Sequence, residues 1–386
     1  MLPVHLKPLN DEILSSWLVR LAMAHGMKVH TFCSNTLSGK AIWNRDIDKC
    51  ADKELVEILS NLTGASIEKV VSTILVDFEG SLYEKHNKFG PTPWILPIGV
   101  YHRKRIHFGM QFCSFCLSED KVPYFRRKWR LVFMVICEKH KVPLEDRCPA
   151  CKSPIIFHRN ELGNFHKLKA TSLTTCYSCQ RDLRHVPKNF EVRSSIEREA
   201  LFVKKLLQTI EDGFFEVSKN NLVHSTLFFV VLHQIMKILA KNDKRVIKLK
   251  EIITKEANSC PYNLSDLTEL NHKLDIQEQP IYFRRQLLFF AAYLLNDWSS
   301  KFVQLSTECK IWSSLWLRNM DGSQGTRSQI APFWFWSVIH EHLCRKRYNP
   351  TSKEIEETIK YLGNNQIPQT KSSVSRLLGA VYLRSL

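Results

Sequence analysis

Four pairs of potential metal ligands between residues 113 and 179 constrain this chain more than any other feature. Two residues separate the ligands in each pair, and the pairs are Cys113 and Cys116, Cys137 and His140, Cys148 and Cys151, and Cys176 and Cys179. Two side chains spaced in this way can reach the same ion from one tight turn, and four ligands complete a tetrahedral zinc site. The eight ligands therefore predict two zinc ions. No coordination position stays open for water or substrate, so both ions are expected to be structural.

The spacing leaves open which pairs share an ion. Sequential sharing gives one three-Cys-one-His site and one four-Cys site, whereas interleaved sharing gives the cross-brace of a RING finger. The ligand order fits a RING finger, but the gap between His140 and Cys148 is longer than such a finger usually has. The segment YFRRKWRLVFMVI at 124–136 also has the pattern of a β-strand pair packed between zinc knuckles. Both features favour two zinc ribbons in series.

The overall composition favours a reduced compartment and a polyanionic partner. The 386 residues carry 55 Lys and Arg against 38 Asp and Glu, a net charge of +17, which is typical of proteins that contact nucleic acid. We see no signal peptide and no apolar stretch long enough to span a membrane. A cytoplasmic, nucleoid-associated bacterial protein is expected, in which twelve cysteines indicate metal rather than disulfides.

Residues 1–110 have the periodicity of helices. Leu14, Trp17, Leu18 and Leu21 share one helical face, Asn10 is expected to cap that helix, and Gly26 to end it before a second helix at 28–37. The pattern recurs over 52–75, where Gly64 allows a turn and Ser66 can cap the next helix. Each pair has the outline of a helix-turn-helix that could enter a major groove, but a plain helical hairpin fits equally well.

The remaining segments complete a mainly α prediction. A linker is expected over 80–110, and helices from 194 onward, including 224–242 and 281–302. The aromatic run PFWFWSVIHEHL at 332–343 is expected to be core rather than a base-stacking platform. The last helices resemble another helix-turn-helix, with a turn at Gly363 and Asn364 and a cap at Thr370 or Ser372. We therefore predict an N-terminal helix-turn-helix domain and linker (1–110), tandem small β zinc ribbons (111–190) and a helical C-terminal domain (191–386).

No catalytic residue is predicted. The chain lacks a phosphate-binding P-loop, a zinc-protease motif and a nucleophile elbow, and its acidic residues form no recognisable nuclease motif. Two basic clusters are candidates for phosphate contact, although a solvated basic face explains them equally well. The clusters are Arg103, Lys104 and Arg105, and Arg126, Arg127, Lys128 and Arg130.

The segment around the first three ligand pairs closely resembles the TniQ/TnsD family of transposon target-selection proteins. The resemblance covers roughly residues 5–180. Its central motif comprises Cys113, Cys116, Glu119, Asp120, Tyr124, Trp129, Cys137, His140, Lys141, Pro143, Leu144, Cys148, Pro149 and Cys151. The start of the chain contributes Pro8, Asp11, Glu12, Ser16, Trp17, Arg20 and Gly26.

This resemblance implies a non-catalytic adaptor. Such proteins mark a DNA target, directly or on an RNA-guided CRISPR complex, and recruit an AAA+ ATPase regulator of the transposase. The family pairs its zinc ligands sequentially, which implies one site at Cys113, Cys116, Cys137 and His140 and another at Cys148, Cys151, Cys176 and Cys179. A RING-type ubiquitin ligase and a zinc-dependent transcription regulator are the alternatives. A homodimer stays open, because the sequence does not fix the oligomeric state.

Overall fold

The computed structural model describes residues 1–37, 42–99, 107–160, 172–185, 194–257, 260–262, 274–318, 320, 330–344 and 350–378. Its α-helices and two strands are α1 (Leu14–Ala24), α2 (Val29–Thr36), α3 (Ile47–Cys50), α4 (Lys53–Thr63), α5 (Ile67–Val71), α6 (Ser114–Glu119), α7 (Ser194–Asp212), β1 (Phe214–Ser218), β2 (Asn221–His224), α8 (Ser225–Leu239), α9 (Lys244–Glu256), α10 (Ile281–Leu295), α11 (Ser300–Glu308), α12 (Ser313–Trp316), α13 (Phe333–His342), α14 (Ser352–Asn364) and α15 (Lys371–Leu378). Short 3₁₀ turns are η1 (Ile42–Asn44), η2 (Leu75–Phe78), η3 (Arg127–Arg130), η4 (Phe157–Arg159) and η6 (Ile276–Glu278). The mainly α prediction is confirmed.

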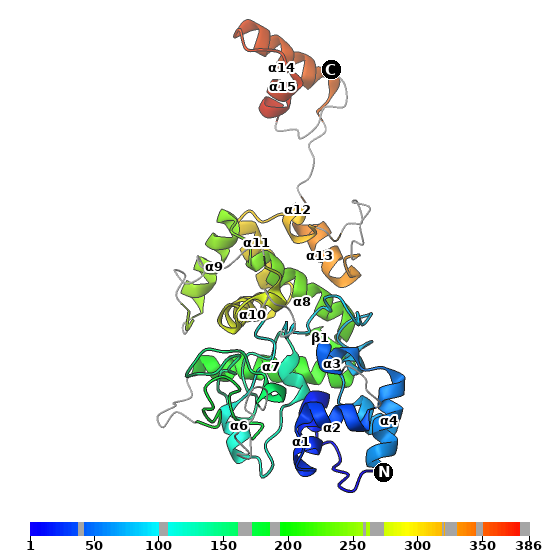
Figure 1. Ribbon diagram of the computed structural model, residues 1–386. Coiled ribbons are helices and arrows are strands. Elements are labelled where there is room, and N and C mark those ends of the chain that lie inside the picture. The colour runs from blue at the N-terminus through cyan, green and yellow to red at the C-terminus, as the bar shows by residue number, and fades with distance from the viewer. Residues whose placement is uncertain are drawn as a thin grey trace.

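Helix α1 is largely buried and lies beside α2 in the N-terminal part (Figure 1). Its predicted face, Leu14, Trp17, Leu18 and Leu21, is fully buried. A turn at Gly26, whose φ is 61°, leads to α2, which packs against α1. The cap predicted at Asn10 is wrong: the helix begins at Leu14, after Ile13 in extended conformation.

The second helical pair, α4 and α5, forms with the expected end signals. Asp52 caps α4, Gly64 ends it with a left-handed φ of 63°, and the Ser66 side chain accepts a hydrogen bond from Lys69 N at the start of α5. Helix α5 ends at Val71, short of the predicted residue 75. Ile74 is nevertheless buried, because the chain continues into the tight turn η2 against the same core.

Part of the segment that was expected to be a linker belongs to the core. Trp94, Ile95 and Leu96 are buried, and the N–H of Leu96 donates to the Arg130 carbonyl at 2.9 Å. The strand pair predicted over 124–136 does not form. That segment contains the turn η3 and, among the described residues, only isolated pairings: Arg126 with Glu12, Leu131 with Ile95, and Ile136 with Pro143.

The C-terminal part is a helical layer around α8 and α10, which pack against each other (Figure 1). Both helices are apolar on most sides, as their sequences predict, and α8 buries Phe228, Phe229, Leu232 and Ile235 completely. The antiparallel hairpin β1–β2 interrupts a region in which only helices were predicted. Phe215 of β1 stacks on Phe228 at a centroid distance of 3.6 Å, which holds the hairpin on α8.

Contacts between the C-terminal helices and the ligand-bearing segment are buried and polar. Arg284 of α10 is 1 % exposed and donates to the Val132 carbonyl at 2.7 Å and to Gln111 Oε1 at 3.0 Å. The Trp94 indole N–H donates to the Phe229 carbonyl at 3.2 Å. A continuous set of buried apolar side chains extends from Ile13 to Leu343. The three predicted regions therefore share one core. The domain boundaries predicted near residues 110 and 190 stay a prediction.

The aromatic run at 332–343 is divided between core and surface. Phe335 and Ile339 of α13 are fully buried, as expected, whereas Phe333 is 77 % exposed and Trp336 is 40 % exposed. The exposed ring of Trp336 stacks on His340 at 4.6 Å. The interpretation as core is therefore correct for one face of α13 only.

Helices α14 and α15 form a hairpin beyond residues 345–349, which lie outside the described part, and Figure 1 shows it apart from the other helices. Thr351 and Glu354 form a capping box at its start. The Thr370 hydroxyl accepts from Ser373 N at 3.1 Å, as predicted for a cap. Gly363 and Asn364 end α14 instead of forming the turn, which follows at Asn365. No helix within the described ranges is long and apolar enough to cross a membrane.

Candidate metal centres

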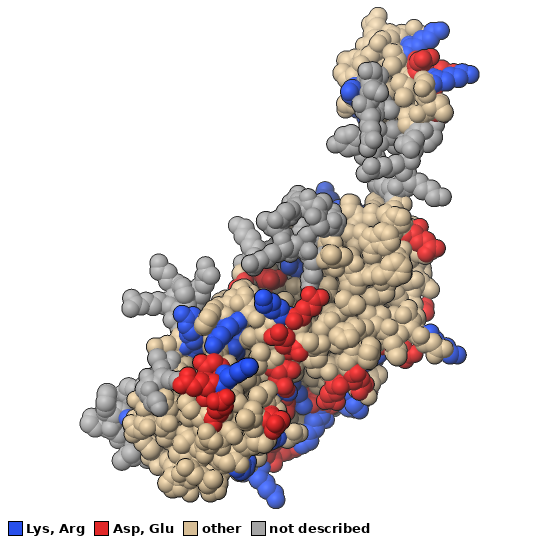
Figure 2. Space-filling model, turned by 90° about the vertical axis from the view of Figure 1, so that its right-hand side faces the viewer, with Lys and Arg blue, Asp and Glu red and all other residues tan. Residues whose placement is uncertain are grey.

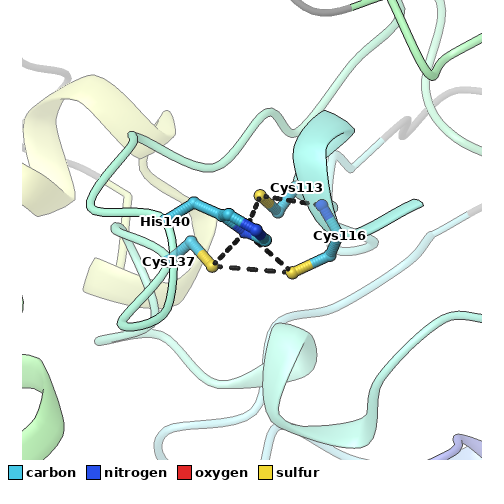
Figure 3. A group of neighbouring side chains, drawn as sticks. All are labelled: Cys113, Cys116, Cys137 and His140. Carbon is cyan, nitrogen blue, oxygen red and sulfur yellow. Dashed lines mark hydrogen bonds between the residues drawn. The ribbon is translucent and has the colours of Figure 1, made fainter. Parts of the chain in front are cut away.

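The first ligand group brings Cys113, Cys116, Cys137 and His140 together (Figure 3). The His140 Nδ1 lies 3.3 Å from the sulfur of Cys116 and 3.5 Å from those of Cys113 and Cys137, and the sulfurs of Cys116 and Cys137 are 3.6 Å apart. A tetrahedral zinc ion would separate two sulfurs by about 3.8 Å and a sulfur from a nitrogen by about 3.5 Å. The donor atoms therefore lie where a zinc ion would require them.

The second group contains the remaining four cysteines. The sulfurs of Cys148 and Cys179 are 3.7 Å apart and those of Cys151 and Cys176 are 3.6 Å apart. Four thiols at this spacing fit zinc, which prefers sulfur and tetrahedral geometry. The grouping in both sites is sequential along the chain. The interleaved grouping that a RING finger requires is not the one formed.

Three of the four ligand pairs end in the same backbone turn. The N–H of the first ligand donates to the carbonyl five residues on, and the N–H four residues on donates back to the first ligand, all at 2.8 to 3.0 Å. The residue at that fourth position has positive φ in each turn: 52° at Lys141, 59° at Lys152 and 61° at Gln180. This local turn aims both side chains of a pair at one point. The pair Cys113 and Cys116 instead begins helix α6.

A carboxylate orients the histidine ligand. Glu119 Oε2 lies 3.0 Å from His140 Nε2, the ring nitrogen that points away from the sulfurs, and 2.5 Å from Lys139 Nζ. Outer carboxylates of this kind fix the tautomer of a metal-bound histidine and leave the other nitrogen as the ligand atom. Phe115 stacks on the same ring at 5.5 Å. Glu119 thus has a structural reason to belong to the motif.

The two sites differ in exposure. Cys113, Cys116 and Cys137 are at most 3 % exposed, whereas Cys151 and Cys179 of the second site are exposed. We therefore expect a chelator to strip the second site first. Stepwise treatment with EDTA, followed by metal analysis, should give a stable intermediate with about half of the bound metal and most of the helical circular dichroism signal retained. Loss of both ions in one step would contradict this order.

The N-terminal residues of the motif hold α1 against the ligand-bearing segment. Glu12 is buried and accepts from Arg20 at 2.6 Å and from the Ser16 hydroxyl at 3.0 Å. The same hydroxyl accepts from Phe125 N at 3.0 Å. The side chains that resemble the family at the start of the chain therefore form an internal polar junction.

The predicted basic cluster at 126–130 lies in the same junction. Arg126 pairs with Asp120 at 2.8 Å and lies over the rings of Tyr124 and Trp129. Arg127 pairs with Asp77, and Lys128 with Glu138. Arg130 is fully buried between Asp46 at 2.6 Å and Asp48 at 3.1 Å. Phosphate contact by these four side chains stays a prediction, and it would require these pairs to open. Arg103, Lys104 and Arg105 lie outside the described residues.

Sequence reasoning overlooked another basic and aromatic group. Phe89 is 68 % exposed, with the Arg45 guanidinium 4.8 Å and the Lys88 amine 5.7 Å from its ring. These residues line a cavity of about 480 Å³, which Asp275 and Glu278 also border. The sequence KHNKFGP at 85–91 could have indicated this group, because it places an aromatic residue among cations beside a Gly-Pro pair. This segment was instead predicted to be part of the linker. On the face in Figure 2, basic and acidic side chains are interspersed.

The Glu145 carboxyl group, near the second ligand group, should make the stability of the protein depend on pH. Burial raises the pKa of Glu145 from 4.5 to about 7, with Lys152 opposing and Asp146 adding to the shift. A raised folded-state pKa gives stability that is complete below the unfolded pKa and is lost as pH rises through about 7. Glu145→Gln should remove that loss, so the variant should be more stable than the wild type by about 1–2 kcal/mol near pH 8 and not near pH 5. Urea unfolding at both pH values measures this, with the exposed Glu57→Gln as control.

Together, these features define a mainly helical protein with two groups of four Cys and His side chains, each of which could hold a metal ion. Residues 3–144 match the family model TniQ. This segment of the chain is therefore similar to the TniQ family; it includes the first ligand group and ends before Cys148 of the second. No curated protein in the comparison matches the chain. The family associates this protein with transposition and with a system that acts on DNA.

Proposed function

We propose that this protein is a non-catalytic target-selection adaptor of a transposon, which marks a DNA target and recruits an AAA+ ATPase regulator. The observation that carries this proposal is the TniQ match over residues 3–144, where the motif side chains form a group that could hold a metal ion and its junction with α1. The second metal site and the C-terminal helices extend beyond the matched segment and share its core. The same function draws support from the net charge of +17.

The metal ions would serve folding. Four protein ligands per site are typical of structural zinc, whereas catalytic zinc keeps a position for water. Cys113, Cys116, Cys137 and His140 would hold one ion and Cys148, Cys151, Cys176 and Cys179 the other. Glu119 would hold the His140 ring in position.

The surface around Phe89 is the described candidate for DNA contact. Arg45 and Lys88 form no ion pair within the described residues, unlike the cations at 126–130, so both are available for phosphates. The exposed ring between them could stack on an unpaired base. Arg45→Glu and Lys88→Glu should each lower affinity for a fluorescent DNA and reduce the salt dependence of binding by about one phosphate contact. The exposed Lys219→Glu, on the β1–β2 turn, is the matched control, and an equal loss in that variant would contradict a local contact.

Capture of genomic fragments by the purified protein separates the two modes of target marking. Enrichment of one discrete site means that the protein reads bases itself. Uniform capture that fades as salt rises means phosphate contact alone, with the target supplied by a partner such as an RNA-guided complex.

Recruitment is tested with the AAA+ ATPase of the same transposon. The adaptor role requires that immobilised protein retain this ATPase on target DNA and that its loss abolish targeted insertion. DNA binding without retention or targeted insertion would overturn the adaptor role and favour a transcription regulator.

A further inference from the structure

A groove lies among α7, α10 and the end of α9, and none of the eight metal-ligand candidates lines it. It encloses about 630 Å³, within the range of ligand-binding sites in proteins. Leu201 and Phe202 of α7 and Leu288, Phe289 and Ala292 of α10 form its apolar lining. Leu201 is 67 % exposed, although it belongs to a helix whose other face is in the core. A large apolar side chain at such a position marks an interaction surface when others surround it.

Cations occupy the border of this groove. Arg198 and Lys205 come from α7 and Lys301 from α11, and none of the three forms an ion pair within the described residues. The amine of Lys205 lies 4.1 Å from the Phe215 ring, and that of Lys301 lies 4.3 Å from the Tyr293 ring. These positive groups are therefore held beside the apolar lining.

The acidic groups of the groove are already occupied. Glu199 is buried and accepts from Arg285 at 2.6 Å and from the Tyr262 hydroxyl at 3.0 Å. Glu256 accepts from the Tyr293 hydroxyl at 2.7 Å. Glu256 is exposed and keeps its negative charge, but the three border cations outnumber it, so the net charge that faces an incoming ligand is positive.

We propose that this groove binds an amphipathic segment of a partner protein, with apolar anchors on one side and Asp or Glu beside them. An apolar helix face fits an apolar groove in many complexes, and the border cations select acidic flanks. Nucleic acid fits less well, because lysines already cover the Phe215 and Tyr293 rings and the lining offers an apolar surface to a phosphate. The border cations come from two helices and therefore suit a ligand with several carboxylates, whereas a fatty acid has a single carboxylate. This proposal is independent of the transposition role.

Selection from a random peptide library tests it on the whole chain. The peptides are about twelve residues long, roughly three helical turns, and are displayed on phage. Peptides selected on the wild type should combine apolar residues with Asp or Glu. Their affinity, measured by fluorescence polarisation, should fall by about tenfold or more in Leu201→Glu and in Lys205→Glu. Leu222→Glu, at 65 % exposure on β2 outside the groove, and Lys219→Glu are the matched controls and should bind as the wild type does.

All variants change exposed side chains, and thermal melts verify that each retains the wild-type fold. The proposal is overturned if the library gives no enrichment, if selected peptides lack acidic residues, or if they bind Leu201→Glu and Lys205→Glu normally. Displacement of a fluorescent fatty acid from the groove, with no peptide selected, would identify a small-molecule site instead. Concentration-dependent dimerisation of the wild type that Leu201→Glu abolishes, with no peptide selected, would identify a second copy as the occupant.

Discussion

Replacement of Cys137 by Ser is expected to remove one of the two metal ions per chain and to unfold the N-terminal part of the protein. Cys137 is 2 % exposed and follows Val132, Phe133 and Ile136, all of which are fully buried. Structural zinc binding contributes roughly 10–16 kcal/mol of apparent free energy, more than the stability of a typical domain of about 5–15 kcal/mol. Loss of the ion should therefore cost the segment its fold. Metal analysis and thermal unfolding followed by circular dichroism measure both effects.

Cys309→Ser provides the comparison, because Cys309 is also a buried thiol but lies outside both ligand groups. It should keep both metal ions and lose stability modestly. If Cys137→Ser keeps two ions and the wild-type melting temperature, the first ligand group does not hold a structural metal. An equal loss of structure in both variants would mean that thiol burial, rather than metal binding, stabilises this region.

Arg130→Met should destabilise the protein by about 3–5 kcal/mol, the usual cost of removing one partner of a buried ion pair. Arg130 is fully buried, and Asp48, which it contacts, is 1 % exposed. Burial raises the pKa of Asp48 to about 7, with Asp46 adding to the shift and Arg130 opposing it. Without Arg130, the Asp48 carboxylate would be buried without its cation, although it would still accept from Ser15 N at 2.7 Å. Urea unfolding of the purified variant measures the loss.

Two further variants separate this effect from others. Arg184→Met removes an exposed pair with Asp182 and should cost less than about 1 kcal/mol. Asp48→Asn combined with Arg130→Met should recover part of the stability, because the unpaired charge is gone. If Arg130→Met retains wild-type stability but loses DNA affinity, the side chain contacts phosphates, as the sequence prediction has it, and the pairing described above is not its main role.

Residues whose roles are local were the most predictable from sequence. The spacing of the ligand pairs predicts groups of metal ligands. Gly64 ends α4 and Ser66 caps α5, as their residue types predict. The two ligands of each pair lie within one short chain segment, so the pairs can be recognised without knowledge of the tertiary structure. The apolar faces of α1 and α8 were visible for the same reason.

Roles that depend on distant partners were not predictable. The cluster at 126–130 looks like a phosphate-binding patch, but its carboxylate partners, such as Asp77 and Asp46, lie far away in sequence. Residues 94–96 look like a linker because Pro and Gly flank them, and only the distant carbonyls of Arg130 and Phe229 reveal them as core. The prediction of a β-strand pair over 124–136 was wrong, because aromatic and β-branched residues are common in buried irregular segments as well as in strands.

The hydrogen bonds of Arg284 and Trp94 determine how the protein can be divided in the laboratory. The match to the family model ends at residue 144, but a fragment cut there would expose the Val132 carbonyl, the Trp94 indole and the Phe133 ring that stacks on Phe229 at 5.6 Å. Such a fragment should aggregate when expressed alone. For the same reason, a chimaera that joins this segment to the C-terminal helices of a relative needs matched residues at 229 and 284. The unit that can be transplanted is larger than the unit that sequence comparison recognises.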